Sequence, residues 1–209
     1  MFVNNVDVID TLNLIANSPF DYILLRNTEN ELPYHLKERK DIDILLNSCD
    51  QANAISYFCN NGFKPIAHPA QGLPKVGAIT DFDFLVNDNN IILDLNYQLF
   101  LCNSARTAFT LHSTALQRSI WEKVHYSLLG DVEVRYIDPE IEFVISFLRC
   151  CIDKRKMSRW NFSRLCEIYE NSNDKDALFA GIAPYYPDYL TEIARMFETK
   201  IWSDFIIIE

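Results

Sequence analysis

The chain has 209 residues, of which 49% are hydrophobic and 23% are charged, as in an ordinary globular domain and unlike a disordered or fibrous chain. Lys and Arg number 19 against 29 Asp and Glu, which gives a formal net charge of −10. A chain this acidic is poorly suited to binding the phosphate backbone of DNA or RNA, so we expect no nucleic-acid partner.

The first part of the chain alternates between helical and extended patterns. In order, the pattern predicts a helix over residues 6–16, strands over 22–25 and 41–46, a helix over 50–60 that Gly62 ends, and a strand over 63–67. Two strand pairs then follow as hairpins, 81–86 with 91–97 around Asn87-Asp88-Asn89-Asn90, and 123–128 with 132–136 around Gly130-Asp131. Residues 26–40 are expected to form a polar loop, and residues 68–77 an ordered loop.

From Asp138 onward the chain is predicted to be helical, with a polar break at 171–176. Asp138-Pro139 combines a good N-cap residue with proline at the first helical position, and apolar residues follow at helical spacing. We therefore expect an α+β fold with a mixed or antiparallel sheet, helices on one face and a C-terminal helical part. Residues 1–137 would form the α+β domain, and residues 138–209 would pack on it.

The sequence favours a cytoplasmic protein that does not insert into a membrane. It shows no secretory signal and no apolar stretch of membrane-spanning length. Six cysteines lack a C-x-x-C pair, so we interpret them as buried thiols and not as disulfides or a zinc site. Four histidines lack metal-binding spacing, so we interpret them as structural or surface residues.

Acidic residues occupy alternate positions in three predicted strands. Asp41 and Asp43 share one face of their strand, Asp81 and Asp83 share a face of the next, and Asp94 stands with Asn96 on the third. A tight turn at Asp88-Asn89 would place Asp83 opposite Asp94 and Asp81 opposite Asn96. We therefore expect five Asp side chains on one sheet face.

Opposed carboxylates destabilise a sheet unless a divalent cation, a raised pKa or basic side chains compensate them. The alternative is a solvated polar face, but these outward positions carry no Lys or Arg. Carboxylates without His or Cys ligands suit Mg²⁺ or Mn²⁺, which leads us to predict such a metal site. Asp83 is a further candidate metal ligand or base partner, and Asp81 is interpreted as a polar edge residue.

The ordered set of motifs resembles the nucleotidyltransferase superfamily, which includes polymerase beta and small bacterial nucleotidyltransferases. The motifs are a strand ending at Leu25-Arg26-Asn27, Asp41-Ile42-Asp43 on the next strand, and a lone Asp94 on a later strand. The resemblance covers roughly residues 20–170 and extends to uncharacterised bacterial nucleotidyltransferase-like proteins. It departs from the family at the first motif, where Leu25-Arg26-Asn27 stands in place of the usual Gly-Ser.

The resemblance implies a role for each acidic residue. Asp41 and Asp43 would bind the metal that holds a nucleoside triphosphate, and Asp94 would bind a second metal and orient or deprotonate the attacking hydroxyl. Arg26, Asn27 and Lys40 would contact the nucleotide, with Arg26 gripping phosphate in place of Gly-Ser.

Further basic residues near the motifs are candidate phosphate ligands. They are Arg39, Lys64 and Lys75, each of which could equally be a solvated surface residue. The run Lys154-Arg155-Lys156 is explained by the dipole at a helix C-terminus, or alternatively Lys154 reaches the phosphates.

The sequence thus predicts an Mg²⁺-dependent nucleotidyltransferase that transfers a nucleotidyl or related phosphoryl group from an NTP to a small-molecule or sugar-phosphate acceptor. The alternative is a catalytically inactive nucleotidyltransferase fold that acts as a nucleotide-binding or protein-interaction module. The missing Gly-Ser supports this alternative. A third possibility, ranked lower, is an enzyme that nucleotidylates a macromolecule.

Overall fold

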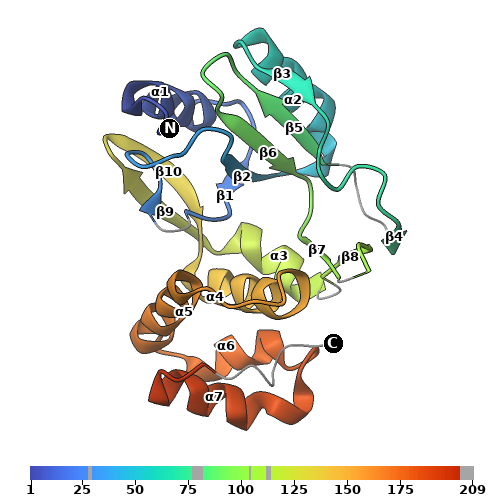
Figure 1. The fold of residues 1–209 in the computed structure, drawn as a ribbon, viewed down its shortest axis with the longest axis vertical. Helices are drawn as coiled ribbons and strands as arrows, with labels where there is room; N and C mark the ends of the chain where they lie inside the picture. Colours follow the sequence, from blue (N-terminus) through green and yellow to red (C-terminus); the bar gives the residue numbers. More distant parts are fainter. Residues whose placement is uncertain (28–29, 77–81, 104, 112–113, 203–209) are drawn as a thin grey trace.

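The computed structural model describes residues 1–27, 30–76, 82–103, 105–111 and 114–202, and it confirms the expected α+β fold (Figure 1). Within these residues a mixed seven-stranded sheet has the strand order β3-β5-β6-β2-β1-β10-β9. Its strands are β1 (Tyr22–Leu24), β2 (Asp41–Leu46), β3 (Lys64–Ile66), β5 (Asp83–Val86), β6 (Ile92–Asn96), β9 (Val124–Leu129) and β10 (Val132–Ile137).

The centre of the sheet brings together strands that are distant in sequence. β2 is antiparallel to β1 and parallel to β6, with Asp43 directly beside Asp94. β1 also runs parallel to β10, so the sheet continues into the β9–β10 hairpin. Parallel neighbours end at the same edge of a sheet, and acidic residues from separate segments therefore meet on β2 and β6.

Two helices, α1 (Asn5–Ala16) and α2 (Gln51–Asn60), cover one face of this sheet. Tyr57 of α2 donates a hydrogen bond to the carbonyl of Leu14 in α1 (3.1 Å), which ties the two helices together. The side chain of Gln51 bonds Asp83 on the same face. As predicted, Gly62 follows α2 with a left-handed φ of 92°, a conformation that glycine adopts without strain.

The apolar side chains of β2 point toward this helical layer and form the core. Ile42, Ile44 and Leu46 are at most 1% exposed, whereas Asp41 and Asp43 alternate with them on the opposite face. The period-two pattern of the sequence thus predicted correctly which side of β2 is buried under helices.

The β5–β6 hairpin has a register one residue away from the predicted one. Asp83 pairs with Leu95, and Phe84, not Asp83, pairs with Asp94. The reason is the turn: Asn90 adopts a left-handed φ of 60°, and the amide of Asn87 bonds the carbonyl of Ile91 (3.1 Å). This loop holds one residue more than a symmetric tight turn, and a one-residue shift moves a side chain to the other face.

A smaller sheet and one helix were not predicted. The sheet has the order β4-β8-β7, formed by β4 (Lys75–Val76), β7 (Phe100–Cys102) and β8 (Ala108–Thr110). Helix α3 (Thr114–Glu122) precedes the β9–β10 hairpin. The segment 68–77, expected to be a loop, thus contributes a short strand. Strands of two or three residues are too short to give a readable alternation in the sequence.

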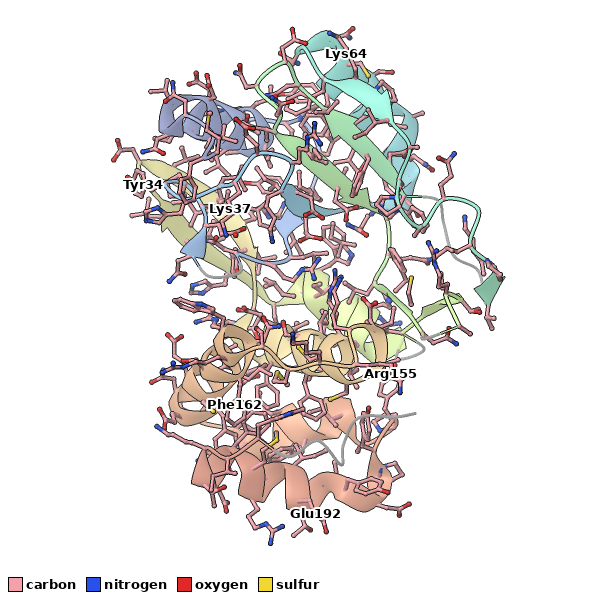
Figure 2. All side chains as sticks on the ribbon, viewed as in Figure 1. Tyr34, Lys37, Lys64, Arg155, Phe162 and Glu192 are labelled. Atoms are coloured by element: carbon pink, nitrogen blue, oxygen red, sulfur yellow. The ribbon has the colours of Figure 1, made fainter. Side chains whose placement is uncertain are left out.

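The C-terminal part is helical as expected. It contains α4 (Pro139–Leu148), α5 (Arg159–Asn171), α6 (Lys175–Ile182) and α7 (Leu190–Thr199). Asp138 caps α4 through a bond to the amide of Glu140 (3.0 Å), with Pro139 at the first position. Figure 2 shows side chains filling the space between these helices. Buried aromatic residues form their core, with Phe143, Phe147 and Phe197 at most 1% exposed.

None of the helices in the described ranges combines the length and the apolar character that crossing a membrane requires.

Candidate functional site

Three carboxylates lie together on the sheet face that α1 and α2 leave uncovered. Asp41 and Asp43 project from β2 and Asp94 from β6, and one oxygen of each lies within 4.8 Å of the others. The side chains of Asp43 and Asp94 are 13% and 12% exposed. The structure therefore brings together the three residues that the sequence analysis had grouped from separate segments.

The expectation of five Asp residues on one face is wrong. Because of the shifted register, Asp83 points to the helical side of the sheet, opposite to Asp94. There its carboxylate accepts hydrogen bonds from Gln51 and from the hydroxyl of Tyr97, both at 3.0 Å. Asp83 is therefore a structural acceptor and not a partner of the triad. Asp81 lies outside the described residues.

Arg26 is the cation that contacts the triad directly. It follows β1, and its guanidinium forms an ion pair and hydrogen bond with Asp43. Burial alone would lower the pKa of Arg26, but the charges of Asp43, Asp94 and Asp41 raise it. The guanidinium is therefore firmly charged and offsets part of the repulsion among the three carboxylates.

Asp94 is the most enclosed of the three carboxylates. Its Oδ1 atom accepts a hydrogen bond from Asn96 Nδ2 (3.1 Å) and lies 3.4 Å from Nε2 of His68. Burial raises the pKa of Asp94; the contact with His68 acts in the opposite direction, and the charges of Asp43 and Asp41 raise the pKa further. Asp94 therefore binds a proton more readily than an exposed aspartate does.

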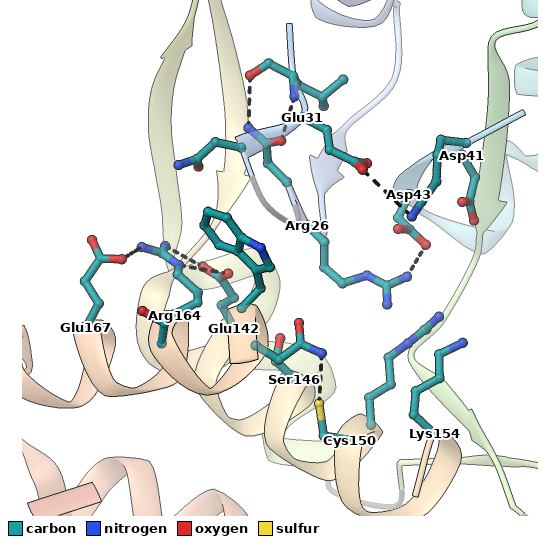
Figure 3. Close-up of a pocket in the computed structure, with 18 of the residues that line it drawn as sticks. Arg26, Glu31, Asp41, Asp43, Glu142, Ser146, Cys150, Lys154, Arg164 and Glu167 are labelled. Atoms are coloured by element: carbon teal, nitrogen blue, oxygen red, sulfur yellow. Dashed lines mark hydrogen bonds and ion pairs between the residues drawn. The ribbon is translucent and has the colours of Figure 1, made fainter. Parts of the chain in front are cut away.

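A cavity of about 360 Å³ opens beside the carboxylates, between the sheet and the C-terminal helices (Figure 3). Asp41, Asp43, Arg26, Asn27 and Lys40 line its sheet side, so each predicted nucleotide-binding residue borders it. The side chain of Asn27 is also bonded to the backbone of Leu32, where its Oδ1 accepts from the amide at 2.8 Å. Lys40 lies 3.9 Å from Glu31. The cavity thus has two carboxylates of the triad, Asp41 and Asp43, at one end and mixed polar groups along its wall.

Two basic residues face the carboxylates from the helical side. After α4 the chain forms a π-helical turn over Arg149–Asp153, closed by a bond from the amide of Lys154 to the carbonyl of Arg149 (2.8 Å). In an α-helix, residues five apart point about 140° away from each other. The wider turn places Arg149 and Lys154 on the same cavity wall, and Figure 3 shows Lys154 extending toward Asp43.

Arg149 was missed by the sequence analysis. Its pKa is lowered by burial and by the nearby charge of Arg26, while Asp43 and Asp94 act in the opposite direction. In the sequence, Arg149 occupies what looks like one more polar position of a long helix, because a π turn has no distinctive sequence pattern. An arginine directly before an adjacent Cys pair gave no signal of its own.

The other candidate cations take different positions. Lys64 pairs with the exposed Asp88 at 2.8 Å, and Lys75 lies over the ring of Phe82, 5.2 Å from its centroid. Arg39 has a left-handed φ of 63°, and its amide bonds the carbonyl of Asn90. None of these three is among the residues that line the described cavity. Its basic lining residues are Arg26, Lys40, Arg149, Lys154 and Arg164.

The far end of the cavity is built by α4 and α5. Glu142, 5% exposed, accepts two hydrogen bonds from Arg164, from Nε at 3.2 Å and from Nη2 at 2.8 Å. Arg164 also bonds Glu167 (3.0 Å), and Trp160 and Asn161 complete the wall. This end carries an aromatic ring and carboxylates that are paired with Arg164, so it can accept an uncharged or weakly charged organic molecule.

The triad suits a small, hard divalent cation. It offers oxygen atoms alone, from three carboxylates whose mutual repulsion Arg26 offsets only in part. His68 reaches Asp94 but is directed at a carboxylate oxygen, so it would support a ligand and not be one. The chemistry of this donor set fits Mg²⁺ or Mn²⁺, and it does not fit zinc.

Comparison with solved structures finds chains of similar fold, of which two are described below. No family model matches the chain, and no curated protein sequence matches it significantly. The chain is similar to the lincosamide antibiotic adenylyltransferase LnuA in its lincomycin-bound form, with 12% identity and a TM-score of 0.48 over 82% of this chain and 100% of that one. It is also similar to an antigenic nucleotidyltransferase-like protein from Paracoccidioides brasiliensis, with 12% identity and a TM-score of 0.43 over 92% and 94%. The function is therefore inferred from the site itself.

Proposed function

We propose that the chain is an Mg²⁺-dependent nucleotidyltransferase that moves a nucleotidyl group from an NTP to a hydroxyl of a small-molecule or sugar-phosphate acceptor. The observation that carries this proposal is the Asp41, Asp43 and Asp94 triad, whose oxygens lie within 4.8 Å of one another beside a cavity with basic residues on its facing wall. An acidic and a basic wall facing each other suit a metal-bound triphosphate.

In this proposal Asp41, Asp43 and Asp94 hold Mg²⁺ or Mn²⁺. Bound metal would neutralise charge on the phosphate oxygens and favour the ionised form of the attacking hydroxyl. The protein's contribution is a fixed set of oxygens on two hydrogen-bonded strands, which keeps their spacing rigid.

The basic residues would bind the triphosphate. Arg149 and Lys154 lie on the helical wall, opposite Arg26 on the sheet side. Charged hydrogen bonds from guanidinium groups to phosphate are short and strong, and they would orient the reacting phosphorus. Residues 1–137 would then supply the acidic half of the site and residues 138–209 the helical basic half, with Asn27 and Lys40 at its margin.

Asp94 would act on the acceptor. The acceptor hydroxyl transfers its proton to Asp94, its oxygen forms a bond to the α-phosphorus, and the bond to the departing pyrophosphate breaks. A carboxylate whose pKa is raised by burial is a better base than an exposed one. The Trp160 end of the cavity would hold the rest of the acceptor.

A second candidate function is a nucleotide-binding or interaction module without catalysis. Arg26 forms an ion pair with Asp43, so in this arrangement one carboxylate of the triad is already paired with a cationic side chain of the protein. The chain also carries Leu25-Arg26-Asn27 where the family it resembles has Gly-Ser. This candidate predicts nucleotide binding that Asp94→Asn leaves unchanged, together with no turnover.

The test is thermal unfolding with Mg²⁺ and each of the four common NTPs, followed by pyrophosphate release with candidate acceptors. We expect a metal-dependent rise in Tm with at least one NTP, abolished by Asp41→Asn combined with Asp43→Asn. Asp83→Asn is the control, because it removes a carboxylate charge from the opposite sheet face and should keep the shift. A protein that shows no shift with any NTP would contradict the proposal.

A further inference from the structure

We propose that His68 is a positioning residue that orients Asp94 for metal binding and for proton acceptance. The inference rests on the proposed function, because it assigns His68 a role toward the same site. His68 lies in the segment after β3, 26 positions before Asp94 in the sequence, and its Nε2 atom is 3.4 Å from Oδ1 of Asp94.

A backbone contact fixes the protonation of the imidazole. The amide of Ala70 donates a hydrogen bond to Nδ1 of His68 at 2.9 Å, so Nδ1 is the acceptor nitrogen and carries no proton. The proton of the neutral ring is therefore on Nε2, the nitrogen that faces Asp94. The ring thus directs an N–H toward the carboxylate oxygen at a distance of 3.4 Å, longer than a usual hydrogen bond, and this N–H has no other partner among the described residues.

Packing fixes the orientation of the ring. His68 lies between Phe82 and Phe84, with centroid distances of 4.2 and 4.3 Å, and its side chain is 9% exposed. Both phenylalanines point to the triad face because Phe84 pairs with Asp94 in the sheet. The shifted hairpin register therefore moves Asp83 away from the triad face and places on that face the aromatic rings that pack against His68.

His68 and Asn96 both contact Oδ1 of Asp94, from Nε2 and from Nδ2 respectively. The Asn96 contact is a hydrogen bond of 3.1 Å, and Nε2 of His68, which has no other partner among the described residues, lies 3.4 Å from the same oxygen. Together these two groups would restrict the rotamer of the carboxylate and leave its second oxygen for a metal ion or the acceptor hydroxyl. Groups that orient a metal ligand in this way commonly contribute about 10- to 100-fold to metal affinity.

Two substitutions separate the two contacts of His68. In His68→Asn, the new side-chain amide can reproduce the acceptor for Ala70 but is too short to reach Asp94. The longer side chain in His68→Gln can place an N–H near the position of Nε2 but loses the acceptor for Ala70. We expect His68→Asn to weaken Mn²⁺ binding at least ~10-fold, by loss of an orienting group. His68→Gln should stay within ~3-fold of the wild type by the same reasoning.

The measurement is titration of the purified full chain with Mn²⁺ alone, followed by the electron paramagnetic resonance signal of the free ion. Circular dichroism and Tm show that each variant is folded. Should His68→Asn not fold, His68→Ala replaces it, because alanine lacks both contacts, and His68→Gln must then bind Mn²⁺ more tightly than His68→Ala.

The outcomes separate this inference from the proposed function. The role of His68 is supported if the wild type binds Mn²⁺ and the affinity decreases in the order wild type, His68→Gln, His68→Asn. Equal affinities of the two variants, or tighter binding by His68→Asn, overturn it and leave the proposed function intact. A wild-type chain that binds no Mn²⁺ contradicts both.

Discussion

Asp94→Asn should stabilise the metal-free protein while removing its response to metal. Two carboxylates 4.8 Å apart repel each other by about 3.5 kcal/mol at an effective dielectric constant near 20, and Asp94 faces two of them. Arg26 offsets part of this repulsion. We therefore expect a net gain of about 1–2 kcal/mol in the free energy of unfolding at pH 7, which raises Tm by about 2–8 °C in a chain of this size.

The substitution should cause little loss elsewhere. Asn96 and His68 both direct donors at Oδ1 of Asp94, and an asparagine amide oxygen at that place can accept from both. The gain must also depend on pH in a defined direction. Burial raises the pKa of Asp94 above its ordinary value of 3.8, so the folded state binds the proton more tightly than the unfolded state does. The protein therefore loses stability as the pH rises from 3.8 through the raised pKa of the folded state. The advantage of Asp94→Asn should therefore shrink as the pH approaches 4.

The assay is thermal unfolding in EDTA across pH 4 to 8, repeated with Mn²⁺ at pH 7. Asp83→Asn is the control, since it changes the net charge equally but at a carboxylate that lies on the opposite sheet face from the triad, where it accepts from Gln51 and Tyr97. We expect no stabilisation from the control. A Tm for metal-free Asp94→Asn at or below that of the wild type at pH 7 would refute the electrostatic reasoning.

Two further predictions concern the helical wall and the thiols. Lys154→Met should weaken binding of an Mg²⁺–NTP complex ~10-fold or more, because a charged contact to phosphate is lost. Lys156→Met, which lies outside the cavity, should leave the affinity unchanged. Isothermal titration calorimetry measures both affinities, and equal effects of the two variants would exclude Lys154 from the phosphate site. Burial raises the pKa of Cys150 to about 11 and that of Cys151 to about 12, so few of these two thiols are ionised at pH 8. A thiol-specific disulfide reagent should therefore modify the exposed Cys49 of the folded protein first. Loss of the fast phase of labelling in Cys49→Ser confirms this, and rapid labelling of Cys150 contradicts the burial argument.

The parts of the site that the sequence predicted are those that follow from strand periodicity. In β2 the alternation of Asp41 and Asp43 with buried isoleucines determines the face of each side chain without any knowledge of the neighbouring strands. Asp94 shares that face because its own strand alternates in the same way. The sequence grouped Asp94 with the other two through the order of motifs that resembles the nucleotidyltransferases, and in the structure β2 and β6 are parallel neighbours.

The parts that the sequence did not predict depend on local backbone choices. Whether Asn90 adopts a left-handed conformation decides the register of the hairpin, and both registers are compatible with an Asn- and Asp-rich turn. The same choice decides whether Asp83 or Phe84 lies beside Asp94. The π turn after α4 likewise depends on packing, and it moves Arg149 and Lys154 to one wall.

The distribution of acidic and basic residues around the cavity explains how so acidic a chain could bind a triphosphate. The net charge of −10 suggested a protein that repels polyanions. The cavity nevertheless sets Asp41 and Asp43 of β2, which lie beside Asp94 of β6, against cations that follow α4, much later in the chain. Neither wall alone suits a triphosphate, because the acidic wall repels it without metal and the basic wall lies apart from the metal ligands. The two parts of the chain must therefore be held together for the proposed reaction, and the packing of α4 against the rest of the fold becomes a requirement of the chemistry as well as of stability.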